Sequence, residues 1–189
     1  MKHIPLLFAL AVAGCGTQVP LWTKDYAAQA TTRHYADVPP AKALAAAEEV
    51  VRLTAPARDV SVKATPGGVD IDRYFNGFIH MHSVTIDYRF TLTATPAGRG
   101  STVTLAIRSN AQDFSAPDAM TGLELSPLLA NGPATVADPY KLFFARMDYI
   151  LGKRTDWVSC TSAPTVLGAS IALDPLCQGA EDRAPAARR

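Results

Sequence analysis

The residues that could support chemistry are few, and the most suggestive are two histidines close together. His80 and His82 flank Met81, and residues two apart on a β-strand project from the same side. Two imidazoles placed in that way would suit a soft or borderline metal ion. A stable zinc site needs three or four protein ligands, and no Asp, Glu or His follows at a suitable spacing. We therefore favour polar residues at the exposed start of a strand, and we predict neither a metal nor another cofactor.

Recognisable catalytic motifs do not occur elsewhere in the chain. The sequence has no Gly-x-Ser-x-Gly, no His-Glu-x-x-His, no Cys-x-x-Cys and no glycine loop of the kind that binds phosphate. We predict that the protein is not an enzyme, with a hydrolase whose site follows no known motif as an alternative.

Asp87 and Arg89 form a possible binding face, because they alternate with apolar residues and so share one side of a strand. Charged residues beside threonines are also the ordinary pattern on the solvated face of a sheet. We favour this second interpretation and keep the first as an alternative.

The composition is that of one globular domain with no strong charge. Of the 189 residues, 48% are hydrophobic and 19% are charged, which is enough apolar material for one core. The 18 Lys and Arg residues nearly balance the 17 Asp and Glu residues, giving a net charge of +1. Because no field of one sign surrounds such a chain, we exclude nucleic acid as a partner.

The N-terminal residues have the layout of a secretory signal peptide. Lys2 is basic, and the apolar residues that begin at Ile4 are followed by small residues and a cysteine. The apolar run is too short to cross a bilayer, which requires roughly 20 residues. We therefore predict that residues 1–14 direct export.

The motif Val12-Ala13-Gly14-Cys15 resembles the lipobox of bacterial lipoproteins. The resemblance implies cleavage before Cys15 and a lipid anchor on that cysteine, which would hold the protein to a membrane. Gly16, in place of Asp, implies sorting to the periplasmic face of the outer membrane. The alternatives are an ordinary signal peptide with an incidental cysteine, and a plain N-terminal anchor helix.

The two remaining cysteines, Cys160 and Cys177, form an even pair in a compartment that permits disulfides. We predict that they are bonded, with two free buried thiols as the alternative. The bridge would close a loop of about 17 residues and contribute on the order of 3 kcal/mol. Trp157 precedes this pair closely, and we expect it to pack in the core rather than to form an exposed contact.

Periodicity divides the rest of the chain into a tether, one domain and a tail. Residues 15–30 read as a lipidated tether without clear periodicity, residues 31–177 as a single domain, and residues 178–189 as a disordered tail. Alternation and helical spacing predict these elements in order: a strand at 31–35, a helix at 40–53, a hairpin at 60–71, a strand at 83–94, its antiparallel partner at 103–108, a loop at 110–137, and a helix at 139–151 that is capped by Asp138 and ended by Gly152.

This order, β-α-β-β-β-β-α, predicts an α+β two-layer sandwich whose antiparallel sheet carries two helices on one face. The order is similar to that of helix-grip-like accessory lipoproteins of the outer-membrane β-barrel assembly machinery. The resemblance implies a non-catalytic accessory or structural binding module that contacts envelope proteins. The alternative is a carrier that holds a small apolar ligand between helix and sheet.

Overall fold

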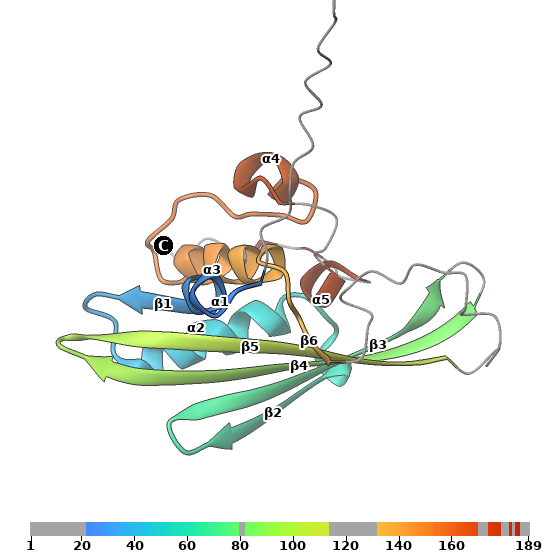
Figure 1. Ribbon diagram of the computed structural model, residues 1–189, viewed down its shortest axis with the longest axis horizontal. Coiled ribbons are helices and arrows are strands. Elements are labelled where there is room, and N and C mark those ends of the chain that lie inside the picture. The colour runs from blue at the N-terminus through green and yellow to red at the C-terminus, as the bar shows by residue number, and fades with distance from the viewer. Residues whose placement is uncertain are drawn as a thin grey trace, which may run out of the picture.

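The computed structural model describes residues 22–79, 82–113, 132–169, 174–178, 182, 184 and 185 (Figure 1). The lipobox and His80 lie outside these residues. The helices are α1 (Lys24–Thr31), α2 (Pro40–Arg52), α3 (Asp138–Ile150), α4 (Ala163–Leu167) and α5 (Asp174–Cys177), with a 3-10 turn η1 (Ala57–Asp59). The strands are β1 (Thr32–Tyr35), β2 (Val60–Thr65), β3 (Gly68–Ile79), β4 (His82–Ala97), β5 (Gly100–Asp113) and β6 (Gly132–Pro133).

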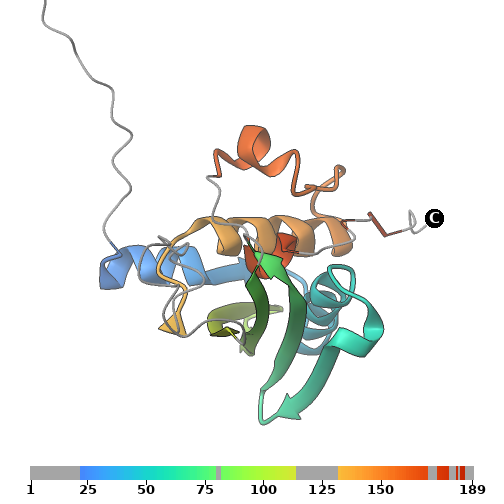
Figure 2. The same cartoon turned by 90° about the vertical axis from the view of Figure 1, so that its right-hand side faces the viewer.

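The strands form one antiparallel sheet in the order β1-β5-β4-β3-β2, and β6 pairs with β5. Figures 1 and 2 show the described helices gathered on one side of this sheet, and none of these helices covers the opposite side. The predicted α+β sandwich with an antiparallel sheet is therefore confirmed. The predicted order is also present, as β1-α2-β2-β3-β4-β5-α3, and additional short elements accompany it.

Period-two alternation explains which face of the sheet is buried. Along β4, alternate side chains point toward the helices and are buried, while those between them point away. Apolar residues of β3, β4 and β5 together form this inner face: Val69, Ile71, Ile86, Tyr88, Phe90, Leu92, Val103, Leu105 and Ile107.

Helix α3 packs on this inner face, as its apolar stripe predicted. The rings of Phe143 and Phe90 stack with their centroids 5.9 Å apart. The stripe residues Tyr140, Phe144 and Met147 are also buried, whereas Ile150 and Leu151 are half-buried. The helix is buried on more sides than one stripe requires, because α1, α2, α4 and α5 also contact it.

The N-terminal segment corrects the prediction that residues 16–30 lack regular structure. Residues 24–31 form helix α1, whose first turn is capped by the Thr23 hydroxyl. Trp22 stacks on Tyr140 of α3, with ring centroids 5.8 Å apart. A contact with a distant element therefore holds a helix that has no apolar stripe of its own.

Three further expectations need correction. The N-cap of α3 is Ala137, and Asp138 is the first helical residue. Helical spacing places Leu44 in the core of α2 together with Ala47, Val50 and Val51. The last three are buried, whereas Leu44 is half-buried, and Ala43 and Ala46 complete the buried stripe. Most of the predicted disordered tail lies outside the described residues, but Gln178 and Asp182 within it make hydrogen bonds to buried side chains.

The described helices include none that is both long and apolar enough to cross a bilayer. The predicted end of α3 is confirmed, since Gly152 follows the helix with a left-handed φ of 71°.

Candidate binding face of the sheet

The candidate binding face is the outer side of β3, β4 and β5, which the described helices leave uncovered. Strand register places its residues in rows across the sheet. One row runs Asp72, Arg89, Arg108, and the next runs Tyr74, Asp87, Asn110. Both residues that the sequence singled out for binding, Asp87 and Arg89, therefore lie in the middle of this face.

Arg89 already has an ion-pair partner within the face, the carboxylate of Asp72. Its Nε donates to Oδ1 of Asp72 at 2.6 Å, and its Nη2 donates to Oδ2 at 3.3 Å. This two-point contact raises the pKa of Arg89, chiefly through the hydrogen bond and the charge of Asp72. Arg89 is 53% exposed, so we expect the pair to contribute little to stability. Its main effect is to hold two side chains flat on the sheet.

Asp87 differs from Arg89 because it retains an unused acceptor. Its Oδ1 atom is buried and has no hydrogen-bond partner among the described residues. Burial raises the pKa of Asp87, the negative charge of Asp72 adds to this effect, and Arg89 partly offsets it. A cation or an N–H group from a partner would satisfy this oxygen once the Asp87 side chain turns it toward the surface.

Tyr74 stands directly opposite Asp87 on the neighbouring strand and is 40% exposed. An exposed tyrosine beside an unsatisfied carboxylate is a combination typical of protein interfaces, where aromatic residues are enriched. Next to this pair, Thr85 donates to Asn76 at 2.7 Å, which fixes the adjoining part of the face.

A separate cleft of about 220 Å³ lies between α1, β1 and α3. Its lining mixes aromatic, polar and basic side chains: Tyr26, Gln29, Ala30, Thr32, Arg33, Ala137, Lys141 and Phe144. Arg33 is paired with Asp148 at 2.7 Å, and Lys141 with Asp138 at 3.0 Å. The cleft is smaller than the roughly 300–1,000 Å³ of usual ligand pockets.

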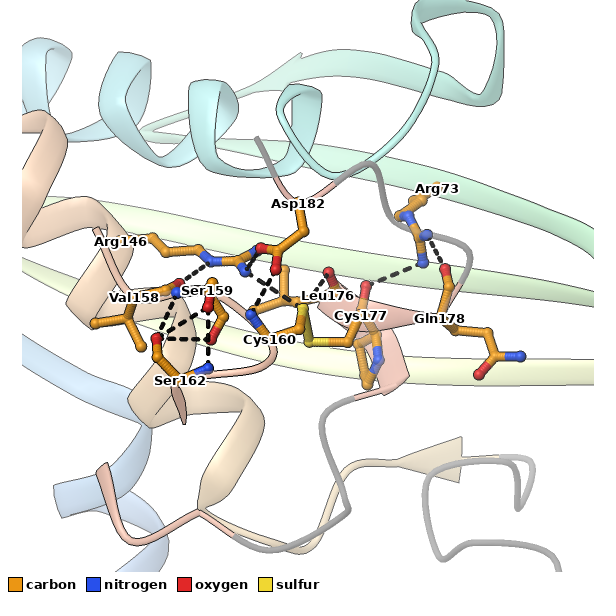
Figure 3. Close-up of a disulfide and its surroundings, with 11 residues drawn as sticks. Arg73, Arg146, Val158, Ser159, Cys160, Ser162, Leu176, Cys177, Gln178 and Asp182 are labelled. Atoms are coloured by element: carbon orange, nitrogen blue, oxygen red, sulfur yellow. Dashed lines mark hydrogen bonds and ion pairs between the residues drawn. A yellow bond between two sulfur atoms is a disulfide. The ribbon is translucent and has the colours of Figure 1, made fainter. Parts of the chain in front are cut away.

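The predicted disulfide between Cys160 and Cys177 is present, with Cα atoms 5.8 Å apart. It links the segment after α3 to α5 (Figure 3). Trp157 is half-buried near it, and the guanidinium of Arg146 lies over the Trp157 ring at 4.8 Å from its centroid. Trp157 was expected in the core, but it packs on Arg146 and the Tyr149 ring and does not belong to the described hydrophobic core.

Sequence reasoning missed two arginines that are among the most buried residues described. Arg146 is fully buried and Arg73 is 1% exposed. Both reach the C-terminal segment: Arg146 binds Asp182, and Arg73 donates to the carbonyls of Pro175 and Gln178. The alternation Val69, Ile71, Arg73 was the available signal, because it places Arg73 on the inner face of β3.

The structure does not describe the positions of the two histidine side chains. His80 lies outside the described residues, and the side chain of His82, at the start of β4, is not described either. Within the part of the chain that is described, no three His, Cys, Asp or Glu side chains gather as metal ligands would.

Searches against protein-family models, curated proteins and solved structures return no match for this chain.

Proposed function

We propose that this chain is a bacterial lipoprotein, held by lipid on Cys15 at the periplasmic face of the outer membrane. Its domain acts as a non-catalytic accessory or structural binding module for another envelope protein. The lipobox at Val12-Ala13-Gly14-Cys15 supports the anchor, and the uncovered sheet face supports the binding role.

One observation carries the binding role, namely the unsatisfied carboxylate oxygen of Asp87 beside the exposed ring of Tyr74. A buried acceptor without a partner costs free energy that a bound donor recovers. A lysine, arginine or main-chain N–H of a partner protein has the required chemistry. The fixed Asp72–Arg89 pair would border that contact and select against a partner with misplaced charge.

The attachment point supports a partner close to the membrane. Six residues separate Cys15 from Trp22, the first described residue, whose ring stacks on Tyr140 of α3. Even fully extended, that connection spans at most about 25 Å. A domain held on so short a connection meets membrane proteins more readily than distant periplasmic ones.

The packing favours this role over that of an apolar carrier. The described side chains between α3 and the sheet, including Phe90 and Phe143, are fully buried against one another. The cleft beside α1 contains two basic residues and lies outside the helix-sheet interface, where the carrier hypothesis placed its ligand.

The test is chemical crosslinking of the full-length, membrane-bound protein in cells, with affinity recovery of the crosslinked partner. Asp87→Ala combined with Tyr74→Ala should reduce recovery at least about tenfold, as expected when a central contact is lost. The matched control is Asp156→Ala, which removes an exposed aspartate on the helix side of the domain. Recovery of the same partner from both variants, with the circular dichroism of both unchanged, would overturn the proposed binding face.

A further inference from the structure

The Cys160–Cys177 disulfide lies between two buried cations. Both cysteines are half-buried, so neither is enclosed completely by the described part of the fold. Arg146 approaches from α3, and its Nη2 donates to Sγ of Cys160 at 3.4 Å (Figure 3). Arg73 approaches from β3 and donates to the carbonyls of Pro175 and Gln178, which flank Cys177 in sequence.

Arg146 keeps its charge in this position. Its Nε donates to the Val158 carbonyl at 3.0 Å, and its Nη2 also donates to Asp182 at 2.6 Å. Burial lowers the pKa of Arg146 to about 10, although Asp182 opposes this effect, so the guanidinium stays protonated at neutral pH. Its Nη1 is buried and has no hydrogen-bond partner in the described part of the chain.

Among the described side chains, the charges around the disulfide do not balance. Among the described residues, the carboxylate that hydrogen-bonds beside the bridge is that of Asp182, and it is bound to Arg146. Arg73 has the Tyr88 ring beneath it and the more distant Asp59, which is itself paired with Arg58. A neutral disulfide leaves this excess positive charge in place, whereas a thiolate at Cys160 would compensate it.

Two effects oppose a thiolate at Cys160, and the guanidinium outweighs them. Partial burial and the charge of Asp182 both favour the neutral thiol. Cys160 is half-buried as a residue, so the cost of desolvation is incomplete. The Asp182 carboxylate is bound by Arg146 at 2.6 Å and by the Cys160 N–H at 2.8 Å. A cation in hydrogen-bond contact lowers the pKa of an acid by about one to three units, as it does in reactive cysteines.

We propose that Cys160–Cys177 is an exchangeable disulfide, which a dithiol reductant opens by attack at Cys177 while Cys160 leaves as a thiolate held by Arg146. A sulfur stabilised as a thiolate is the better leaving group, which directs the attack to its partner. The bridge is thus a reaction site for a dithiol as well as a structural link.

The electrons balance in two steps. The thiolate of the dithiol bonds to Sγ of Cys177, and the electron pair of the broken Sγ–Sγ bond goes to Cys160. The second thiol of the dithiol gives its proton to water and displaces Cys177, which takes up a proton. The dithiol becomes a disulfide after losing two electrons, and the protein retains a Cys160 thiolate and a Cys177 thiol.

The decisive measurement is the pH profile of iodoacetamide alkylation of the reduced full-length protein, with tandem mass spectrometry to assign the label to each cysteine. The midpoint of each profile gives the pKa of that thiol and does not depend on accessibility. An ordinary cysteine has a pKa near 8.5. We expect the midpoint of Cys160 to lie at least about one unit below that value and below the midpoint of Cys177. At pH 6.5 this difference corresponds to about tenfold more thiolate.

Variants separate this proposal from a purely structural disulfide. Arg146→Met should return the Cys160 midpoint to the ordinary range, Asp182→Asn should lower it further, and the surface control Arg58→Met should leave it unchanged. Equal midpoints for Cys160 and Cys177 in the wild-type protein would overturn the proposal. An ordinary wild-type midpoint for Cys160, including one that results from unfolding of the reduced protein, would overturn it equally.

Discussion

Arg146 on α3 and Asp182 near the end of the chain form an ion pair of 2.6 Å across 36 residues of sequence. The same carboxylate accepts the backbone N–H of Cys160 at 2.8 Å. Asp182 has a left-handed φ of 46°, which is uncommon for a residue other than glycine. The two hydrogen bonds therefore hold Asp182 in place, although its own backbone conformation is unfavourable.

We expect Asp182→Asn to reduce the free energy of unfolding by about 2–4 kcal/mol, because it leaves the buried Arg146 charge without its counter-ion. Arg146→Met combined with Asp182→Asn should cost less than the two single changes added together, by about 1 kcal/mol or more. Urea denaturation of the four proteins gives this coupling. The more exposed pair of Arg154 and Asp156, 2.7 Å apart, is the matched control and should show a smaller coupling. Strict additivity for the buried pair would contradict the prediction.

The sequence predicts the sheet and α3 well because each carries its own periodic signal. The unbroken alternation through residues 83–94 fixes which face of β4 is buried, and the spacing of Phe143 and Met147 fixes a buried face of α3. The disulfide also followed from composition alone, since Cys160 and Cys177 are the pair that remains after the lipobox cysteine is set aside.

The features that sequence reasoning missed depend on contacts between distant residues. Helix α1 has no apolar stripe, and the Trp22–Tyr140 stack across the fold holds it in place. The spare acceptor of Asp87 also could not be predicted. It depends on the strand register, which places Arg89 opposite Asp72, so that Arg89 binds Asp72 rather than Asp87. Arg146 lies among apolar helix neighbours, and its burial requires the partner Asp182, which sequence reasoning assigned to a disordered tail.

Phe143→Ala should lower the free energy of unfolding by about 3–5 kcal/mol, because it removes a fully buried ring that stacks on Phe90. Chemical denaturation should show a lower midpoint with an unchanged slope. Val166→Ala, on α4 and 45% exposed, is the control and should change stability by no more than about 0.5 kcal/mol. A loss below about 1 kcal/mol for Phe143→Ala would mean that α3 does not pack closely on β4.

Asp148 should make stability depend on pH in a defined direction. Burial raises its pKa, and the ion pair with Arg33 at 2.7 Å offsets this only in part. Because the folded-state pKa lies above the unfolded value, the folded protein binds the proton more tightly. The contribution of Asp148 to stability is therefore full below the unfolded pKa, near 4, and is lost as the pH rises through the folded value.

The free energy of unfolding of the wild type relative to Asp148→Asn, measured by urea denaturation between pH 3 and pH 7, should accordingly fall as the pH rises. Other titrating groups are common to both proteins and cancel in the difference. A difference that grows with pH would show instead that the pair with Arg33 outweighs burial and that folding lowers the pKa of Asp148.

Cys15→Ser should release the protein from membranes, because the lipobox resemblance assigns the anchor to that sulfur. Stable anchoring takes at least two acyl chains, which a diacylglyceryl cysteine carries and a serine cannot accept. Mass spectrometry of the mature wild-type N-terminus should show cleavage before Cys15 and the added mass of lipid, and fractionation should place the variant outside the membrane pellet. The domain should unfold at the same temperature in both proteins, since the substitution changes none of the contacts described from Trp22 onward. A variant with Cys160→Ser and Cys177→Ser is the control: it loses the disulfide and keeps the lipid. An unmodified Cys15, or cleavage at another position, would remove the basis for placing this domain at the outer membrane.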